Sequence, residues 1–130
     1  MDQAEIVHSI VGSLLEEQAL VDDPEWDTVA VVATVTPDYS GMTAYRYAGE
    51  HAGRATPLRG TEHQLFRDLQ DATKGPDDQT WEVCIVKIER DSARGSVNFV
   101  YPDEAQIWRI DPADPTRLAE NLRPRPEDFN

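Results

Sequence analysis

Thr28-Val-Ala-Val-Val-Ala-Thr-Val35 is the most strand-like segment in this chain of 130 residues. Valine and threonine, which are branched at Cβ and favour strands, occupy every position except the two alanines. Because successive side chains point to opposite faces of a strand, both faces of this stretch carry small and mostly apolar groups. We therefore predict a well-buried strand over residues 28–35.

The segments around this strand are predicted to pair as hairpins. Residues 37–41, with the sequence Pro-Asp-Tyr-Ser-Gly, have turn chemistry and precede an alternating segment. Two further alternating segments are separated by a five-residue turn that ends in Gly95. Pro57 would place one more short strand at an edge of the sheet. The strands predicted after the first one cover residues 42–48, 52–58, 81–90 and 96–101.

Apolar residues at spacings of three and four predict amphipathic helices over residues 3–20 and 61–74. Thr61 opens a capping-box pattern at the start of the second helix. A short third helix over residues 115–122 follows two Asp-Pro pairs, a combination suited to a helix N-terminus. Prolines in residues 123–130 favour an extended C-terminal tail.

The order of these segments predicts a protein of the α+β class. Short connections and tight turns favour a mostly antiparallel sheet of four to six strands, with helices packed on one face. Residues 1–122 are expected to form a single domain, and residues 123–130 an extended tail. The residues predicted to fill the core are Val31, Leu65, Leu69, Val83, Ile85 or Val86, and Phe99.

The charge of the chain indicates the class of partner. The sequence holds 12 Lys+Arg and 25 Asp+Glu, a formal net charge of -13. The first 50 residues hold 10 acidic residues and one basic residue, which leaves -9 in that part. Such a field repels a phosphate backbone, so we expect no nucleic-acid partner, whereas a basic protein would be attracted.

Other features of the composition indicate the compartment. No stretch approaches the roughly 20 apolar residues of a membrane span, and the first residues lack the layout of a signal peptide. We therefore expect a cytoplasmic protein with no membrane partner. Cys84 is the only cysteine, which excludes an internal disulfide and a zinc site built from several thiolates.

Few residues suggest catalysis. His8 falls in the first predicted helix, His51 in a loop and His63 at the start of the second helix, without the spacing of a zinc-binding helix. A cluster of His51, His63 and Glu62 would need a contact made by the fold. Cys84 lies among apolar strand residues, where core packing is favoured over a nucleophilic role. We expect no enzyme, no cofactor and no metal ion.

Aromatic and acidic residues meet at the end of the last predicted strand. Tyr101, Asp103, Glu104 and Trp108 lie within eight residues, directly after Phe99. Aromatic rings next to carboxylates suit a protein-binding surface, because rings give rigid contact and acids select a cationic partner. The alternative interpretation is that Phe99 and Trp108 belong to the core and that the acids only face solvent.

The layout of these segments resembles that of the YezG-like immunity proteins. The resemblance rests on the N-terminal helix, the Thr43-Ala44-Tyr45-Arg46-Tyr47 strand, the strand at Trp81 and the aromatic and acidic strand end before Trp108. It covers most of residues 3–110 and departs after Trp108, where the double Asp-Pro segment follows. The resemblance implies an α+β antitoxin of a bacterial polymorphic toxin system, which neutralises a toxin domain by binding it. It places Phe99, Tyr101, Asp103, Glu104 and Trp108 in the family's strand-end signature.

Three functions remain open from the sequence. The first is an immunity protein that binds a basic toxin domain through Tyr101, Asp103, Glu104 and Trp108. The second is an acidic interaction or regulatory module that forms a homodimer through an exposed strand edge. The third is a small enzyme that uses His51, His63 and nearby carboxylates.

Overall fold

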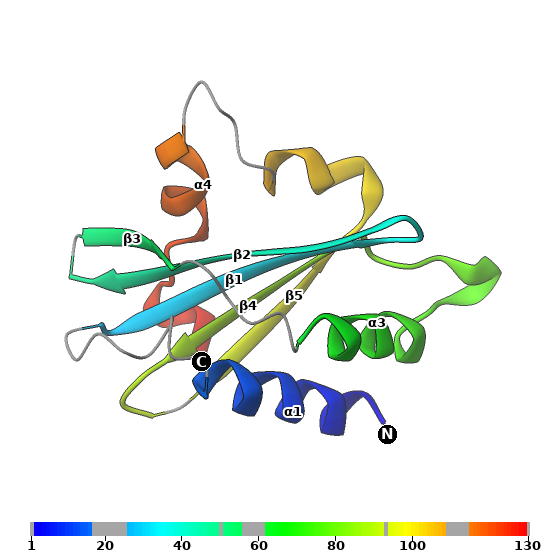
Figure 1. Ribbon diagram of the computed structural model, residues 1–130, viewed down its shortest axis with the longest axis horizontal. Coiled ribbons are helices and arrows are strands. Elements are labelled where there is room, and N and C mark those ends of the chain that lie inside the picture. The colour runs from blue at the N-terminus through cyan, green and yellow to red at the C-terminus, as the bar shows by residue number, and fades with distance from the viewer. Residues whose placement is uncertain are drawn as a thin grey trace.

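The computed structural model contains one five-stranded sheet in the order β3-β2-β1-β4-β5, in which every neighbouring pair is antiparallel (Figure 1). The structure describes residues 2–16, 26–49, 51–55, 62–92, 94–108 and 115–129. The strands are β1 (Thr28–Thr36), β2 (Tyr39–Ala48), β3 (His51–Ala55), β4 (Val83–Glu89) and β5 (Gly95–Val100). The predicted α+β class and antiparallel sheet are confirmed.

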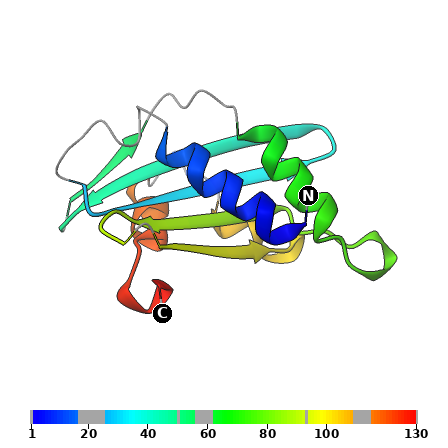
Figure 2. The same ribbon diagram turned by 90° about the horizontal axis from the view of Figure 1, so that it is seen from below.

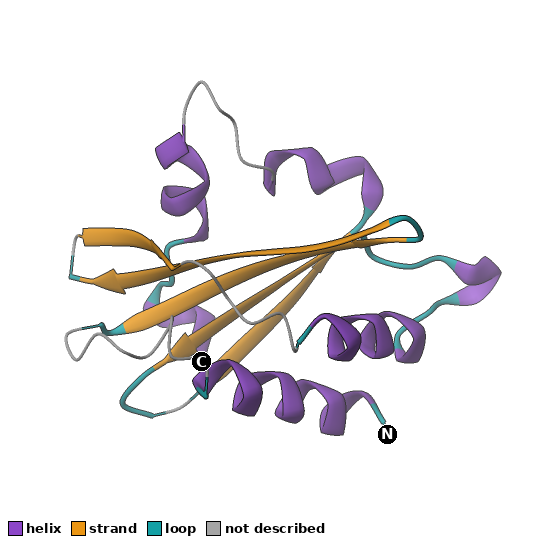
Figure 3. Cartoon of the chain, viewed as in Figure 1, coloured by secondary structure: helices purple, strands orange, loops and turns teal. Residues whose placement is uncertain are grey.

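Helical segments lie on both sides of this sheet, as the colouring by secondary structure shows (Figure 3). The α-helices are α1 (Gln3–Leu15), α3 (His63–Ala72) and α4 (Pro115–Leu122). Three 3₁₀ segments complete the described chain: η1 (Pro76–Asp78), η2 (Pro102–Trp108) and η3 (Pro126–Phe129).

Helices α1 and α3 cover the first face of the sheet (Figure 2). Helix α1 buries Ile6, Ile10 and Leu14, which recur every four residues and so line one side of the helix. Helix α3 buries Phe66 and Leu69. They pack on odd-numbered residues of β1 and even-numbered residues of β4, among them Val31 and Val86, which are paired across the two strands. Of the other predicted core residues on this face, Leu65 and Phe99 are only half-buried.

The second face is covered by the C-terminal part of the chain, so the prediction that helices pack on one face only is wrong. Leu118 and Leu122 of α4 and Ala105 of η2 are buried against Val32 and Ile85 of the sheet. Figure 1 shows α4 and η2 on the side of the sheet opposite to α1 and α3. The physical reason is that β1 and β4 are apolar on both faces, and both faces need cover.

Tyr47 of β2 ties α4 to this second face. Its hydroxyl donates to the carbonyl oxygen of Ala119 over 2.6 Å, and the Arg123 guanidinium lies 5.1 Å from the ring centroid. Burial raises the pKa of Tyr47, and this effect exceeds the opposing influence of Arg123. The hydroxyl therefore keeps its proton and remains a donor at neutral pH.

The element boundaries differ from the predicted ones in several places. Helix α1 ends at Leu15, and residues 17–20 of the predicted helix lie outside the described residues. Strand β2 begins at Tyr39, because the turn between β1 and β2 is shorter than its sequence suggested. Strand β3 is the predicted edge strand, of which residues 56–58 lie outside the described residues. Helix α3 has Glu62 as its N-cap, and Thr61 is also outside them.

The predicted extended C-terminal tail is wrong for the part that the structure describes. Pro126–Phe129 form the 3₁₀ segment η3, which is attached to the sheet. Asp128 accepts a hydrogen bond from the Lys87 ammonium over 3.1 Å and another from the Arg125 amide over 2.7 Å. Lys87 is 9% exposed, so the tail supplies the carboxylate that a nearly buried ammonium requires.

Replacing Leu69 with alanine is expected to lower the free energy of unfolding by about 2–5 kcal/mol, because Leu69 is fully buried between α3 and the sheet. Urea unfolding followed by circular dichroism measures this loss. Asp71→Ala, on the exposed side of the same helix, is the control and should change stability by no more than about 0.5 kcal/mol. A loss below about 0.5 kcal/mol for Leu69→Ala would contradict the docking of α3.

Asp128→Asn is expected to lower the free energy of unfolding by about 1–3 kcal/mol at pH 7, because Lys87 loses a charged partner. Burial raises the pKa of Asp128, but the Arg125 amide and Lys87 together lower it below the ordinary value. A lowered pKa stabilises the fold above the unfolded-state pKa, and this contribution is lost as the pH falls through the folded-state pKa.

The stability difference between the wild type and Asp128→Asn should therefore be full above about pH 5 and shrink in more acidic solution. Thermal unfolding between pH 3 and pH 7 tests it. Glu127→Gln, at the exposed neighbouring position, is the control and should change stability at pH 7 by no more than about 0.5 kcal/mol. A difference that stays constant down to pH 3 would show that the charge of Asp128 is not involved.

Candidate functional site

The acidic and aromatic residues predicted to bind a partner lie where β5 runs into η2. Tyr101 connects the two elements, and Pro102 opens η2 in a position that suits proline. Asp103 and Glu104 are exposed. Tyr101 and Ile107 are among the most exposed large apolar side chains, at 47% and 56%. We call Tyr101, Asp103, Glu104 and Ile107 the η2 surface.

Two residues on the inner side hold η2 against the sheet. Ala105 is completely buried, and Trp108 is half-buried against the cluster on the second face. The Trp108 side chain is thus on the side of η2 that faces the sheet, whereas Tyr101, Asp103 and Glu104 are exposed. Ile107 was not among the predicted site residues, because no pattern in the sequence shows which side of this segment faces the sheet.

Phe99 does not belong to this surface. Its ring stacks on Trp81, with the centroids 5.4 Å apart and an angle of 14° between the planes. Phe99 pairs with Cys84, whose side chain belongs to the core under α1 and α3. The strand alternation therefore directs Phe99 to the first face and its neighbours Asn98 and Val100 to the second.

The η2 surface borders a shallow depression. Tyr101, Pro102 and Asp103 line it together with Gln79 and Thr80, and it encloses about 480 Å³. Gln79 and Thr80 precede β4, whereas the other three lining residues follow β5. The depression therefore lies at the open end of the hairpin that β4 and β5 form. This contact follows from the pairing of β4 with β5, which is the second hairpin that the sequence predicts.

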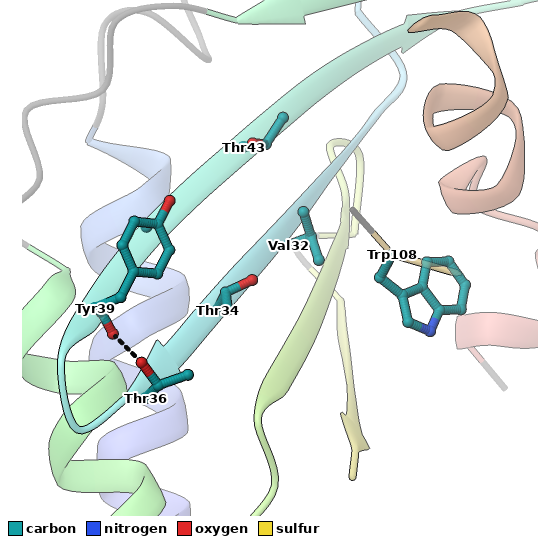
Figure 4. Close-up of a pocket in the computed structure, with 7 residues that line it drawn as sticks. Val32, Thr34, Thr36, Tyr39, Thr43 and Trp108 are labelled. Carbon is teal, nitrogen blue, oxygen red and sulfur yellow. Dashed lines mark hydrogen bonds between the residues drawn. The ribbon is translucent and has the colours of Figure 1, made fainter. Parts of the chain in front are cut away.

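A second groove lies on the open part of the second face and is bordered by Trp108 (Figure 4). Its floor consists of Val32 and Thr34 of β1 with Thr43 of β2, and its volume is about 490 Å³. At the hairpin end, the Thr36 hydroxyl donates to the carbonyl oxygen of Tyr39 over 3.5 Å. Thr34 was predicted within a well-buried strand, but it is half-buried because α4 and η2 cover only part of this face.

The histidines do not form a common site. His51 begins β3 opposite Ala48, whereas Nδ1 of His63 lies 2.7 Å from the hydroxyl of Ser40. Ser40 and Ala48 lie near opposite ends of β2, about 27 Å apart along an extended strand. His8 is exposed on α1. The enzyme alternative based on convergence of His51 and His63 therefore lacks its geometry.

Contacts around His63 have a structural explanation. The Arg67 guanidinium donates to the carbonyl oxygen of Thr36 over 3.4 Å, and Ser40 contacts His63. Both contacts fasten the hairpin of β1 and β2 to α3. The neighbouring Glu62 is fully buried and accepts a hydrogen bond from the Ser13 hydroxyl over 2.8 Å, which connects α1 to α3. Among the described residues, its second carboxylate oxygen has no hydrogen-bond partner.

Cys84 is completely buried in β4, and burial raises the pKa of its thiol to about 12. The thiol is therefore protonated at pH 8, and a reagent that needs a thiolate should not label the native protein. Addition of a chromogenic disulfide reagent at pH 8 tests this, with the same protein in denaturing urea as the positive control. Complete labelling of the folded protein within seconds would contradict the burial of Cys84.

Comparison with known proteins adds no identification: the chain matches no family model and no curated protein. Within the described ranges, histidine, cysteine, aspartate and glutamate side chains nowhere gather in threes as a metal ion would require. None of the described helices has the length and apolar character needed to cross a membrane.

Proposed function

We propose that this chain is a non-enzymatic binding protein, an immunity protein of the YezG-like type that neutralises a basic toxin domain by direct contact. The observation that carries the proposal is the η2 surface, where exposed Tyr101 and Ile107 flank exposed Asp103 and Glu104. The net charge of -13 and the resemblance of the sequence to that family support it.

The two kinds of side chain would act at different stages of binding. The carboxylates attract a cationic partner over a distance of roughly 8–10 Å at physiological salt and so raise the association rate. The ring of Tyr101 and the side chain of Ile107 bury apolar area after docking and so slow dissociation. Such a division matches an inhibitor that must find its target quickly and keep it.

The attachment of η2 supports a pre-organised surface. Ala105 and Trp108 hold the segment against the sheet in the free protein, so less conformational entropy is lost on binding. Trp108 has in this proposal a supporting role beneath the contact residues, whereas Tyr101 is the exposed aromatic anchor. The protein would act in the cytoplasm of the producing cell, where it covers the basic active site of the toxin.

Co-expression tests the proposed function. The proposal expects the adjacent upstream gene to encode a toxin domain, and the C-terminal domain of that gene product is made in a bacterial host with and without this protein. Survival only in its presence, together with co-purification of the two proteins, is the expected result. Death of the cells despite soluble expression of this protein would overturn the immunity function.

Charge reversal tests the η2 surface itself. Asp103→Lys combined with Glu104→Lys should lower the association rate with the toxin domain by roughly tenfold or more at low salt and weaken its salt dependence. Tyr101→Ala should mainly raise the dissociation rate, at a cost of about 2 kcal/mol. Stopped-flow and surface-binding kinetics measure both rates.

The control is the double variant Asp71→Lys with Glu127→Lys, which changes the net charge equally at two exposed positions on other elements. It should affect association much less than the reversal on η2. Equal effects of the two double variants would mean that only the overall charge matters and that η2 is not the contact surface.

A further inference from the structure

Strand β5 lies at one edge of the described sheet. It pairs with β4 on one side, and no other strand among the described residues pairs with its outer side. Natural edge strands are protected from further pairing by proline, charged side chains, bulges or a covering helix or loop. Segment η3 contacts β5, and its Asp128 is bonded to Lys87, a residue of β4 that strand alternation places on the second face. The sequence Gly95-Ser-Val-Asn-Phe-Val100 has no proline or charge, and its register with β4 runs without interruption. The opposite edge strand, β3, is shorter and contains Arg54.

The hydrogen-bond phase shows which backbone groups of β5 face outward. The Glu89 amide donates to the carbonyl oxygen of Arg94 over 2.9 Å, just beyond the paired residues Ile88 and Gly95. In an antiparallel pair, hydrogen-bonded and non-hydrogen-bonded positions alternate. Ser96 and Asn98 are thus bonded to β4. The N–H and C=O groups of Gly95, Val97 and Phe99 are directed toward the open edge.

A groove lies beside this edge on the first face of the sheet. One side of α1 lines it with Asp2, Ala4, Val7, His8 and Val11, and it reaches β5 at Gly95, enclosing about 620 Å³. A Cβ atom on Gly95 would come within 3.3 Å of Val11, so the helix and the strand are in close contact there. Residues opposite Gly95, Val97 and Phe99 on an added strand would project to this same face.

The charge around the edge selects the kind of strand that would pair there. Asp2 and Glu5 lie in the first turn of α1, and Asp103 and Glu104 lie in η2, shortly after the end of β5. All four are exposed. A second copy of this chain would bring another net charge of -13 to the same edge, so electrostatic repulsion opposes self-association. A basic partner segment would be attracted instead.

We propose that the partner adds an extended segment to β5, with apolar side chains at alternate positions over the α1 groove and a basic side chain near Asp103 and Glu104. Backbone hydrogen bonds to Val97 and Phe99 would provide affinity, and the groove would provide selectivity. The inference rests on the proposed function, because it describes how the toxin domain would reach the η2 surface.

Amide hydrogen exchange, resolved by NMR on the wild-type protein, tests strand addition. In the free protein the amides of Val97 and Phe99 should exchange faster than those of Ser96 and Asn98, which are bonded to β4. Addition of the toxin domain should slow the exchange of the Val97 and Phe99 amides by at least roughly tenfold. The exchange rates of the Ser96 and Asn98 amides should stay nearly unchanged. Unchanged exchange at Val97 and Phe99 in a formed complex would overturn the inference and leave the immunity function standing.

A variant pair provides a second measurement. Val97→Pro removes an outward amide without removing a hydrogen bond to β4, and it should weaken binding by roughly tenfold or more. Asn98→Ala is the control on the same strand, since its side chain is exposed on the other face. It should bind like the wild type, and circular dichroism verifies that both variants fold.

Three further outcomes would each contradict strand addition, and they differ in what they imply for the proposed function. A wild-type dimer that Val97→Pro converts to a monomer would mean that a second copy occupies the edge, and it would overturn the proposal. A toxin domain that does not bind at all would overturn both this inference and the proposed function. Normal binding by a folded Val97→Pro variant would overturn strand addition alone.

Discussion

Strand β1 has apolar side chains on both of its faces, and most of the architecture follows from the need to remove both faces from water. Its neighbour β4 has the same property, so the centre of the sheet is buried on each side. Helices α1 and α3 cover one face, and α4 with η2 covers part of the other. Because parts of the chain far apart in sequence supply the two layers, the fold brings both ends of the chain to the same sheet.

The position of the proposed binding surface depends on this second layer. Segment η2 stays on the sheet because the side chains of its own Ala105 and Trp108 pack against the second face. The same attachment leaves the residues of the η2 surface in solvent. One side of η2 therefore belongs to the core, and its other side forms the proposed binding surface. The cover is incomplete, and the threonine-lined groove beside Trp108 is the part of this face that no described helix occupies.

Buried polar groups connect the layers to the sheet at particular points. Lys87 is paired with Asp128 of the C-terminal segment, Tyr47 donates to Ala119 of α4, and Ser13 donates to the buried Glu62 at the start of α3. Each of these contacts satisfies a polar group that would otherwise be costly in the core. The contact between Lys87 and Asp128 also explains why Pro126–Phe129 adopt a defined 3₁₀ turn despite a proline-rich sequence.

Local signals were enough to predict the α+β class, the central strand at 28–35 and the residue range of helix α4, because alternation, helical spacing and Asp-Pro pairs involve neighbouring residues. The sequence also placed acidic and aromatic residues together at the end of β5, since they are neighbours in the chain. Tertiary contacts were needed to show that α4 and η2 cover the second face and that Trp108 turns inward while Ile107 is exposed. They were also needed to show that His51 and His63 lie far apart. These features depend on which strands pair and on which face of the sheet each helix packs. Such contacts join residues far apart in the sequence, and no pattern of neighbouring residues indicates them.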